Sequence, residues 1–532
     1  MLRRLAPLAV LVATLLAPAP GHAAAARPSV PPMQVPGEAR AAAATPDRWL
    51  IGTRDTVAAE RIARRHGALS LRLPGTFSIA TGRARALIAE IRAAGVLVYA
   101  EPDVPLERQA SFDGQTDGWA RSAVMPPDLP APAPDAAVGI IDSFVDGQHP
   151  DLAGHVSFLP SPYTEVMTDA HGTMVASAVA GAANGSGVTG VFPGAPIVSF
   201  GLPAEFGCAE VSNGVVALAE AKVRVINMSL GGPSPCFTLY RATMQAYGAG
   251  IVIVAAAGNE FQEGNPVMYP AGFPHVLSVA AVDPELGSSF FSNESAAIDV
   301  SAPGERVPLA VPGVFDTDGD VDGVTVADGT SFAAPIVAGA AAWLTSARRD
   351  LDHGQISDLI RFSATDLLGE GWDSATGFGL VNLPRALTAP TPPSDLLEPN
   401  DDISLVDGRV FARPDPPVWR GFGTRTIRAT VDEAEDPADV YRVSLPARSA
   451  LTVLVRPRYG DPDLEFYDRP ARTIYSRRSR VASSYRGAGR TDVVRLVNRS
   501  RRRRTGYVVV FVPVEARYAD AGYTLRIRRG RR

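Results

Sequence analysis

Residues 223–260 read VRVINMSLGGPSPCFTLYRATMQAYGAGIVIVAAAGNE, and this stretch decides the fold. An apolar run opens it, a segment of helix-forming composition follows, and a second apolar run closes it. Apolar runs without polar alternation are typical of strands that are covered on both faces, as in parallel sheets. The stretch therefore predicts one strand-helix-strand unit of an α/β domain.

The same alternation extends to both sides, over residues 135–388. Its other strand-like runs are AAVGII, PIVSFGL, HVLSVAAV and AIDVSAPG, and its other helix-like segments include HGTMVASAVAGAA and VSNGVVALAEAK. We expect a doubly wound, mostly parallel sheet with helices on both faces. In such domains the functional residues lie at the carboxyl ends of the strands.

Two different patterns flank this domain. Residues 46–108 show the order β-α-β-β-α-β of a small ferredoxin-like unit. Residues 397–532 contain short alternating runs between turn-rich stretches, which predict an antiparallel β-sandwich. Residues 109–134 and the Pro-rich residues 389–396 are expected to be linkers.

The first 23 residues have the pattern of a secretory signal peptide. Arg3 and Arg4 precede an apolar stretch, and small residues around Ala23 suit a cleavage site. Residues 24–45 are expected to be a linker. No later segment has the roughly 20 uncharged apolar residues that cross a bilayer, so we expect no membrane span and a secreted, periplasmic or extracellular protein.

Bulk composition excludes some function classes. Of 532 residues, 46% are hydrophobic and 20% are charged, and the formal net charge is only −5. Such a chain has no general bias toward nucleic acid or anionic membrane. The arginine cluster at Arg499–Arg504 is interpreted as a solvated loop. Cys208 and Cys236 could form a disulfide in an oxidising compartment, or remain two small buried thiols.

Three polar residues lie at sequence positions that suit roles in catalysis. Asp142 ends the apolar run of VGIIDSFVDGQHPDL, where a carboxylate can orient an imidazole. His171 opens the helix-like HGTMVASAVAG, which fixes a general base. Ser331 lies in DGTSFAAPIVAGAAAWL at a helix N-terminus, whose free N–H groups stabilise an anion. Each residue alone could equally be a turn, surface or capping residue.

Together these motifs resemble the D-[ST]-G, H-G-T and G-T-S-x-A-x-P signatures of subtilisin-like serine proteases, peptidase family S8. The order Asp, His, Ser also agrees. The resemblance implies a serine endopeptidase acting on polypeptides and requiring no cofactor. It implies Ser331 as nucleophile, His171 as general base and then acid, and Asp142 as the group that orients the imidazole.

The resemblance extends to residues around the catalytic ones. Asn259 in VAAAGNE matches the residue that donates to the oxyanion together with the backbone N–H of Ser331. Leu230, Gly231 and Gly232 match the edge strand that binds an extended substrate. Met268 falls at the base of the pocket for the residue before the cut bond, where it would favour small or medium apolar side chains.

The flanking units also resemble known domains. A ferredoxin-like unit before such a protease resembles the inhibitory propeptide of the family, so we expect a zymogen with its own propeptide as a partner. Self-processing is expected in residues 109–134. EPND at 398–401, DVYRVSL, GDPDLEFYD and GYTLRI resemble the pre-peptidase C-terminal domain of secreted bacterial proteases.

One residue departs from the family pattern. Phe144 stands where the family usually has glycine after D-[ST], and a backbone that needed glycine there would displace Asp142. The alternative from another class is a catalytically inactive binding module that kept the fold. A lipase-like hydrolase is disfavoured because no G-x-S-x-G is present, and a zinc peptidase because no H-E-x-x-H is present.

An acidic loop is a candidate for structural calcium. DTDGDVDG places Asp316, Asp318, Asp320 and Asp322 at alternating positions around a glycine, like the start of an EF-hand loop. The closing glutamate is absent, because the twelfth position is Ala327. A solvated acidic turn is the alternative.

Overall fold

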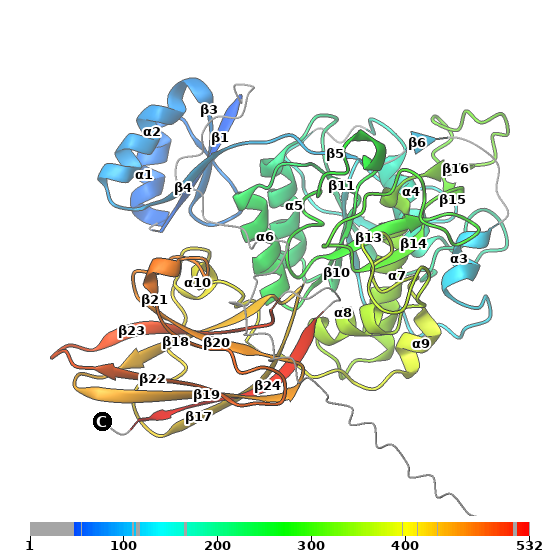
Figure 1. The fold of residues 1–532 in the computed structure, drawn as a ribbon. Helices are drawn as coiled ribbons and strands as arrows, with labels where there is room; N and C mark the ends of the chain where they lie inside the picture. Colours follow the sequence, from blue (N-terminus) through cyan, green and yellow to red (C-terminus); the bar gives the residue numbers. More distant parts are fainter. Residues whose placement is uncertain are drawn as a thin grey trace, which may run out of the picture.

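The computed structural model describes residues 47–530, except 55, 109–110, 113–117, 164–166, 396, 412, 434 and 514–518. The predicted signal peptide and the linker that follows it lie outside these residues. Figure 1 shows a large α/β domain, with an N-terminal unit (blue) and a C-terminal unit (orange to red) on the same side of it.

The α/β domain is built on a seven-stranded sheet of order β14-β13-β12-β10-β7-β9-β8. Every pairing within it is parallel. The strands are β7 (Val138–Asp142), β8 (Val156–Phe158), β9 (Ile197–Gly201), β10 (Val225–Met228), β12 (Val252–Ala256), β13 (Leu277–Val282) and β14 (Val300–Pro303). The continuously apolar runs thus form the parallel sheet that the sequence predicts. Asp142 ends β7, where the strand order changes direction.

Helices cover both faces of this sheet. One apolar core contains residues of α4 (His171–Ala180) and α7 (Thr330–Ala347), and another contains residues of α5 (Cys208–Glu220) and α6 (Phe237–Gly248). Short elements complete the domain: α3 (Trp119–Val124), β11 (Leu230–Gly231), η1 (Phe261–Glu263), β15 (Val307–Ala310), β16 (Val324–Asp328), α8 (His353–Phe362) and α9 (Leu383–Thr388). Among the described residues, α7 alone is long and apolar enough to span a membrane, and 89% of it is buried in this core.

The N-terminal unit has the succession of strands and helices that its sequence pattern predicts. Its elements are β1 (Arg48–Thr53), α1 (Thr56–His66), β2 (Leu69–Ser70), β3 (Thr76–Ala80), α2 (Thr81–Ala93) and β4 (Leu97–Pro102). The strands form an antiparallel sheet of order β2-β3-β1-β4. Buried apolar residues of both helices and of the sheet share one small core.

The C-terminal unit consists of two four-stranded antiparallel sheets, ordered β17-β24-β19-β22 and β18-β23-β20-β21. Its elements are α10 (Ile403–Val406), β17 (Thr424–Asp432), β18 (Ala438–Leu445), β19 (Ser449–Tyr459), β20 (Asp463–Asp468), η2 (Arg477–Ser479), β21 (Arg480–Ser484), β22 (Asp492–Asn498), β23 (Arg504–Phe511) and β24 (Asp520–Arg529). Apolar residues of both sheets share one core. Alternating strands with one buried face favour this arrangement.

Candidate active site

Asp142 and His171 form a buried hydrogen-bonded pair. The imidazole Nδ1 lies 2.8 Å from Asp142 Oδ1 and 2.9 Å from Oδ2. The two residues are only 1% and 2% exposed. Since the carboxylate accepts at Nδ1, the proton resides there and Nε2 is the ring nitrogen that can accept a proton. Among the described residues Nε2 has no hydrogen-bond partner.

Ser331 is the second residue of α7 and is fully buried. Its Oγ donates to the carbonyl of Ser229 at 3.0 Å, and Ser229 Oγ donates to the carbonyl of Ser331 at 2.7 Å. The ring of the next residue, Phe332, lies 5.6 Å from the ring of His171 between centroids. Ser331 thus lies at a helix N-terminus whose next residue packs near the imidazole, and its Oγ is bonded to the Ser229 carbonyl.

Phe144 does not occupy a backbone conformation that requires glycine. Among the described residues, Phe144 is not one of the non-glycine residues that have a positive φ. Its ring covers Gly201 at the end of β9, where an added Cβ would lie 2.5 Å from the ring. The backbone N–H of Ser143 donates to Asp142 Oδ1 at 2.7 Å, and Gly172 N–H donates to Ser143 Oγ at 2.8 Å. The turn after β7 therefore holds Asp142 beside His171 with Phe144 present.

Asn259 follows β12 and contacts the residue before Ser331. Its Oδ1 accepts from the backbone N–H of Thr330 at 3.0 Å and from the Thr330 hydroxyl at 2.9 Å. Because Oδ1 accepts both bonds, the amide is oriented with its Nδ2 donor away from Thr330. The side-chain amide is therefore fixed next to the N-terminus of α7.

The edge strand β11 is paired with residues from the N-terminal side of the chain. Strand β5 (Glu107–Arg108) lies antiparallel to it, with Leu230 opposite Arg108 and Gly231 opposite Glu107. On the other side, the Leu106 N–H donates to the carbonyl of Phe206, and the Cys208 N–H donates to the carbonyl of Val104. Residues 104–108 therefore lie as an extended strand between residues 206–208 and β11.

The chain next pairs close to Ser331. Strand β6 (Ser111–Phe112) is antiparallel to β16, with Ser111 opposite Asp328, three residues before Ser331. Two described segments thus pair close to the serine: β5 pairs with β11, which follows Ser229, and β6 pairs with β16, which precedes α7. Their pairing agrees with the near-complete burial of Asp142, His171 and Ser331.

A sequence model of the subtilase family matches residues 134–379. The subtilisin of Bacillus pumilus is 37% identical over 259 residues, which cover 47% of this chain and 90% of that protein. The chain belongs to the subtilase family. Fervidolysin of Fervidobacterium pennivorans is 36% identical over 287 residues, 48% of this subtilase and 41% of that protein. The alignment with subtilisin E of Bacillus subtilis covers 65% of that protein.

The crystal structure of fervidolysin, described as a keratinolytic enzyme related to subtilisin, resembles the fold with a TM-score of 0.60. The likeness covers 88% of this subtilase and 89% of that chain at 22% identity. Structural similarity therefore extends beyond residues 134–379, whereas the sequence matches span less than two thirds of fervidolysin and subtilisin E.

Met268 of this subtilase is buried between the two segments expected to line the substrate pocket. It is 4% exposed, and a Cβ added to Gly258 would lie 2.5 Å from Met268 Cγ. A Cβ added to Gly231 would lie 3.9 Å from Met268 Cε. Tyr269 and Gly232 exchange two backbone hydrogen bonds of 2.9 and 3.0 Å, which fix Met268 against the edge strand.

The predicted calcium loop does not gather its carboxylates. Among the described residues, no three of Asp316, Asp318, Asp320 and Asp322 have carboxylate oxygens within 4.8 Å of one another. Three of them instead accept from backbone N–H groups of the loop, Asp316 from Gly323, Asp318 from Asp320 and Asp322 from Val324. The bonds of Asp318 and Asp322 have the geometry of Asx turns, whereas the bond of Asp316 closes the loop.

Cys208 and Cys236 are bonded in the structure, with Cα atoms 6.5 Å apart. Cys208 begins α5, and Cys236 directly precedes α6. The bridge thus joins the N-termini of two helices whose outer side faces the N-terminal unit.

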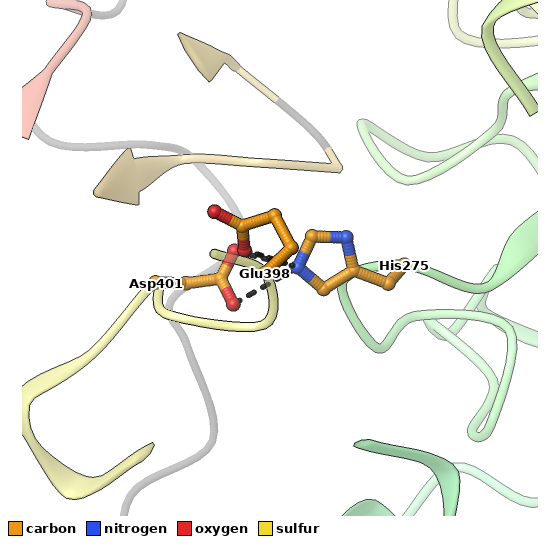
Figure 2. A group of neighbouring side chains, drawn as sticks. All are labelled: His275, Glu398 and Asp401. Carbon is orange, nitrogen blue, oxygen red and sulfur yellow. Dashed lines mark hydrogen bonds and ion pairs between the residues drawn. The ribbon is translucent and has the colours of Figure 1, made fainter. Parts of the chain in front are cut away.

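Sequence reasoning missed a group of acidic side chains around His275. The imidazole Nε2 lies 3.0 Å from Asp401 and 3.3 Å from Glu398 Oε2 (Figure 2). His275 precedes β13, whereas the two carboxylates precede α10, more than 120 residues later. EPND was the available signal, but nothing in it indicated a histidine partner in another domain.

Proposed function

We propose that this subtilase is a secreted serine endopeptidase, made as a zymogen that processes itself. The single observation that carries the proposal is the position of residues 104–108. They add a strand to β11, which is how an extended substrate binds by β-augmentation, and β11 directly follows Ser229, whose Oγ donates to the Ser331 carbonyl. Residues of the same chain thus occupy the position that an extended substrate would take. This arrangement suits a protease whose first substrate is its own chain.

The proposed reaction assigns one role to each of the three side chains. Ser331 Oγ attacks the carbonyl carbon of the bound peptide while His171 Nε2 removes its proton. Asp142, bonded to Nδ1, stabilises the imidazolium that forms. The imidazolium then gives the proton to the departing amine, leaving an acyl-enzyme. A water molecule, deprotonated by His171, hydrolyses that ester and restores Ser331.

Two donors are proposed for the negative charge on the carbonyl oxygen. The Ser331 backbone N–H lies in the first turn of α7, and the Asn259 side-chain amide is oriented by Thr330. Both are fixed before substrate binds, so little reorganisation is needed when the charge develops.

Residues 47–108 are proposed as the inhibitory propeptide, and residues 397–532 as a pre-peptidase C-terminal-like β-sandwich. The processed bond is proposed to lie between Arg108 and Ser111, because β5 pairs with β11, which follows the Ser331 partner Ser229, and β6 pairs with β16, which ends three residues before Ser331. Residues 109–110 themselves lie outside the described part of the chain. Secretion rests on the signal-like pattern of residues 1–23.

A fluorophosphonate probe tests the nucleophile. We expect the processed protein to be labelled on Ser331 and the Ser331→Ala chain to remain unlabelled and uncleaved. N-terminal sequencing of the processed protein should begin at residue 109, 110 or 111. A folded wild-type chain that takes no label would instead support the inactive binding module.

Pocket preference and calcium are tested separately. With Met268 at the pocket base, a peptide library should show small or medium apolar residues before the cut bond, and a preference for arginine or glutamate there would contradict this role.

For the acidic loop, a calcium-dependent rise in melting temperature that Asp318→Ala abolishes would support the predicted site.

A further inference from the structure

The two sheets of the C-terminal unit differ in what lies against their outer faces. Ile403 and Val406 of α10 pack with residues of β18, β20 and β23, so this helix lies on the outer face of one sheet. The other sheet, β17-β24-β19-β22, lies on the opposite side of the unit from α10 (Figure 1). Its inward side chains, such as Leu525 and Ile527, belong to the core between the sheets. The side chains that alternate with them therefore point outward.

Five exposed arginines share this outer face. They are Arg428 of β17, Arg456 of β19, Arg495 of β22, and Arg526 and Arg528 of β24. Thr524 is the cross-strand neighbour of both Arg428 and Arg456. Thr452 is likewise the neighbour of both Arg495 and Arg528. The register thus gathers arginines from four strands into one basic patch, which we call the arginine face.

Neighbouring arginines of this face are close enough to act on one ligand. Residues of a strand rise about 3.4 Å each, so the Cα atoms of Arg526 and Arg528 are about 7 Å apart. Strands lie roughly 4.8 Å apart, so the Cα atoms of Arg428 and Arg456, two strands from each other, are separated by about 10 Å. Both separations are similar to the Debye length of about 8 Å at physiological ionic strength, so the positive potentials add.

The protein itself does not neutralise the arginine face. Among the described residues, none of its five guanidinium groups forms an ion pair or a hydrogen bond. In the other sheet, by contrast, Arg480 and Arg504 are paired with acidic side chains. Asp432 and Asp520 share the outer face but lie at its end next to α8, where Asp432 is bonded to Arg361. The uncompensated positive charge favours a polyanionic ligand.

The surroundings of the arginines favour a polysaccharide over other polyanions. Thr424, Thr426 and Thr524 lie beside them, and their hydroxyls can bond to the hydroxyl groups of a sugar. In the described register no aromatic side chain lies between the arginines, whereas single-stranded nucleic acid binds through bases stacked on aromatic rings. An extended peptide binds to a sheet mainly through backbone hydrogen bonds, and on this face the backbone groups are already paired within the sheet.

We propose that the arginine face binds a linear anionic polysaccharide. Its carboxylate or sulfate groups pair with the guanidinium groups, each of which can donate two parallel hydrogen bonds to such an anion. Its hydroxyl groups bond to the threonines. The site is separate from the catalytic serine and from the arginine loop of residues 499–504, and it gives the subtilase a surface for attachment to a polysaccharide matrix.

Three decamers with one negative charge in each unit test the proposal: decagalacturonate, decaglutamate and a thymidine decanucleotide. Fluorescence anisotropy of the labelled decamers measures their binding to the full-length Ser331→Ala chain, which cannot digest itself. Decagalacturonate should bind more tightly than the other two, and its binding should weaken as salt is added because the contacts are between exposed charges. Arg526→Gln/Arg528→Gln removes two adjacent arginines of the face and should raise the Kd at least about ten-fold.

The matched control is Arg501→Gln/Arg502→Gln, which removes the same charge from the exposed loop of residues 499–504 and should change the Kd less than about two-fold. Far-ultraviolet circular dichroism checks that each variant is folded, and Arg428→Gln/Arg456→Gln serves as the second sheet variant if the first is not. The proposal is overturned if decagalacturonate does not bind, if decaglutamate or the decanucleotide binds as tightly, or if the loop variant loses as much affinity as the sheet variant.

Discussion

Ser331 owes its position to the two residues before it. Gly329 has a φ of 147°, which residues with a side chain rarely adopt, and its N–H donates to the carbonyl of Gly304 at 2.7 Å. Thr330 is held by both of its bonds to Asn259. The G-T-S sequence is therefore a geometric requirement for presenting a serine at this helix N-terminus, which is why so short a motif could indicate the site.

Replacing Asn259 should lower turnover and leave substrate binding nearly unchanged. Asn259→Ala removes both the proposed oxyanion donor and the acceptor for Thr330, whereas Asn259→Asp keeps the acceptor and loses the donor. We expect kcat to fall about 100-fold to 1,000-fold in both variants, the range for which subtilisin itself is the reference case. Steady-state kinetics on a peptide substrate measures this, with the exposed Gln262→Ala as control. An Asn259→Asp enzyme with wild-type kcat would refute the donor role.

Among the elements, the predictable ones are those with enough residues to show a pattern. Strands such as β12 and β13 are continuously apolar over five or six residues, so composition indicates them. Strands β5, β6 and β11 have two residues each and form only because distant segments meet. The family resemblance anticipated β11 as an edge strand, but no local pattern could predict β5 and β6, which place the chain next to the candidate active site.

Strand β4 of the N-terminal unit ends on the N-terminus of α6. Glu101 accepts from the backbone N–H groups of Phe237 and Thr238 at 2.9 and 2.8 Å, and from the Thr238 hydroxyl at 2.7 Å. Asp103 accepts from the Ala209 N–H at 3.1 Å, in the first turn of α5. N–H groups in the first turn of a helix lack intrahelical acceptors, so the oxygens of these two residues satisfy them and anchor the unit on the catalytic domain.

Docking of the N-terminal unit should weaken as the pH rises. Burial, partly offset by hydrogen bonds from Thr238 and Phe237, raises the pKa of Glu101 from 4.5 to about 7. Burial likewise raises the pKa of Asp103 to about 7. A docked state with the raised pKa holds its proton more tightly than the undocked state, so docking is strongest below pH 4.5 and weakens through pH 7.

Hydrogen exchange of the β4 amides in the Ser331→Ala chain measures this, after correction for the intrinsic pH dependence of exchange. Protection should fall between pH 5 and pH 8, and the fall should be smaller in Glu101→Gln, whose side chain stays neutral. Glu60→Gln, on the exposed side of α1, is the matched control. Protection that increases with pH would contradict the prediction.

On the scale of the whole molecule, the three units meet at Arg241 of α6. The side chain is only 4% exposed, and its Nη1 donates to Thr76 Oγ1 at 3.0 Å and Tyr99 OH at 3.3 Å, both in the N-terminal unit. Its Nε donates to the carbonyl of Val410 in the C-terminal unit at 2.9 Å. Leu405 lies in the same apolar core as Tyr99. The sequence pattern predicted the three units but not the contacts between them. Residues more than 140 positions apart in the chain share no local pattern.

Arg241→Met should loosen both flanking units at once. Methionine retains an apolar stem but removes the donors, leaving Thr76 Oγ1, Tyr99 OH and the Val410 carbonyl without this partner. Hydrogen bonds from a charged donor contribute roughly 1.5–3 kcal/mol each, so local opening should become at least about ten-fold more frequent. Hydrogen exchange on the Ser331→Ala chain should show lower protection in both β3 and residues 405–411. Arg349→Met, which removes an exposed ion pair with Asp135, should change neither segment. If only one flanking unit loosened, the two would be held independently and Arg241 would not couple them.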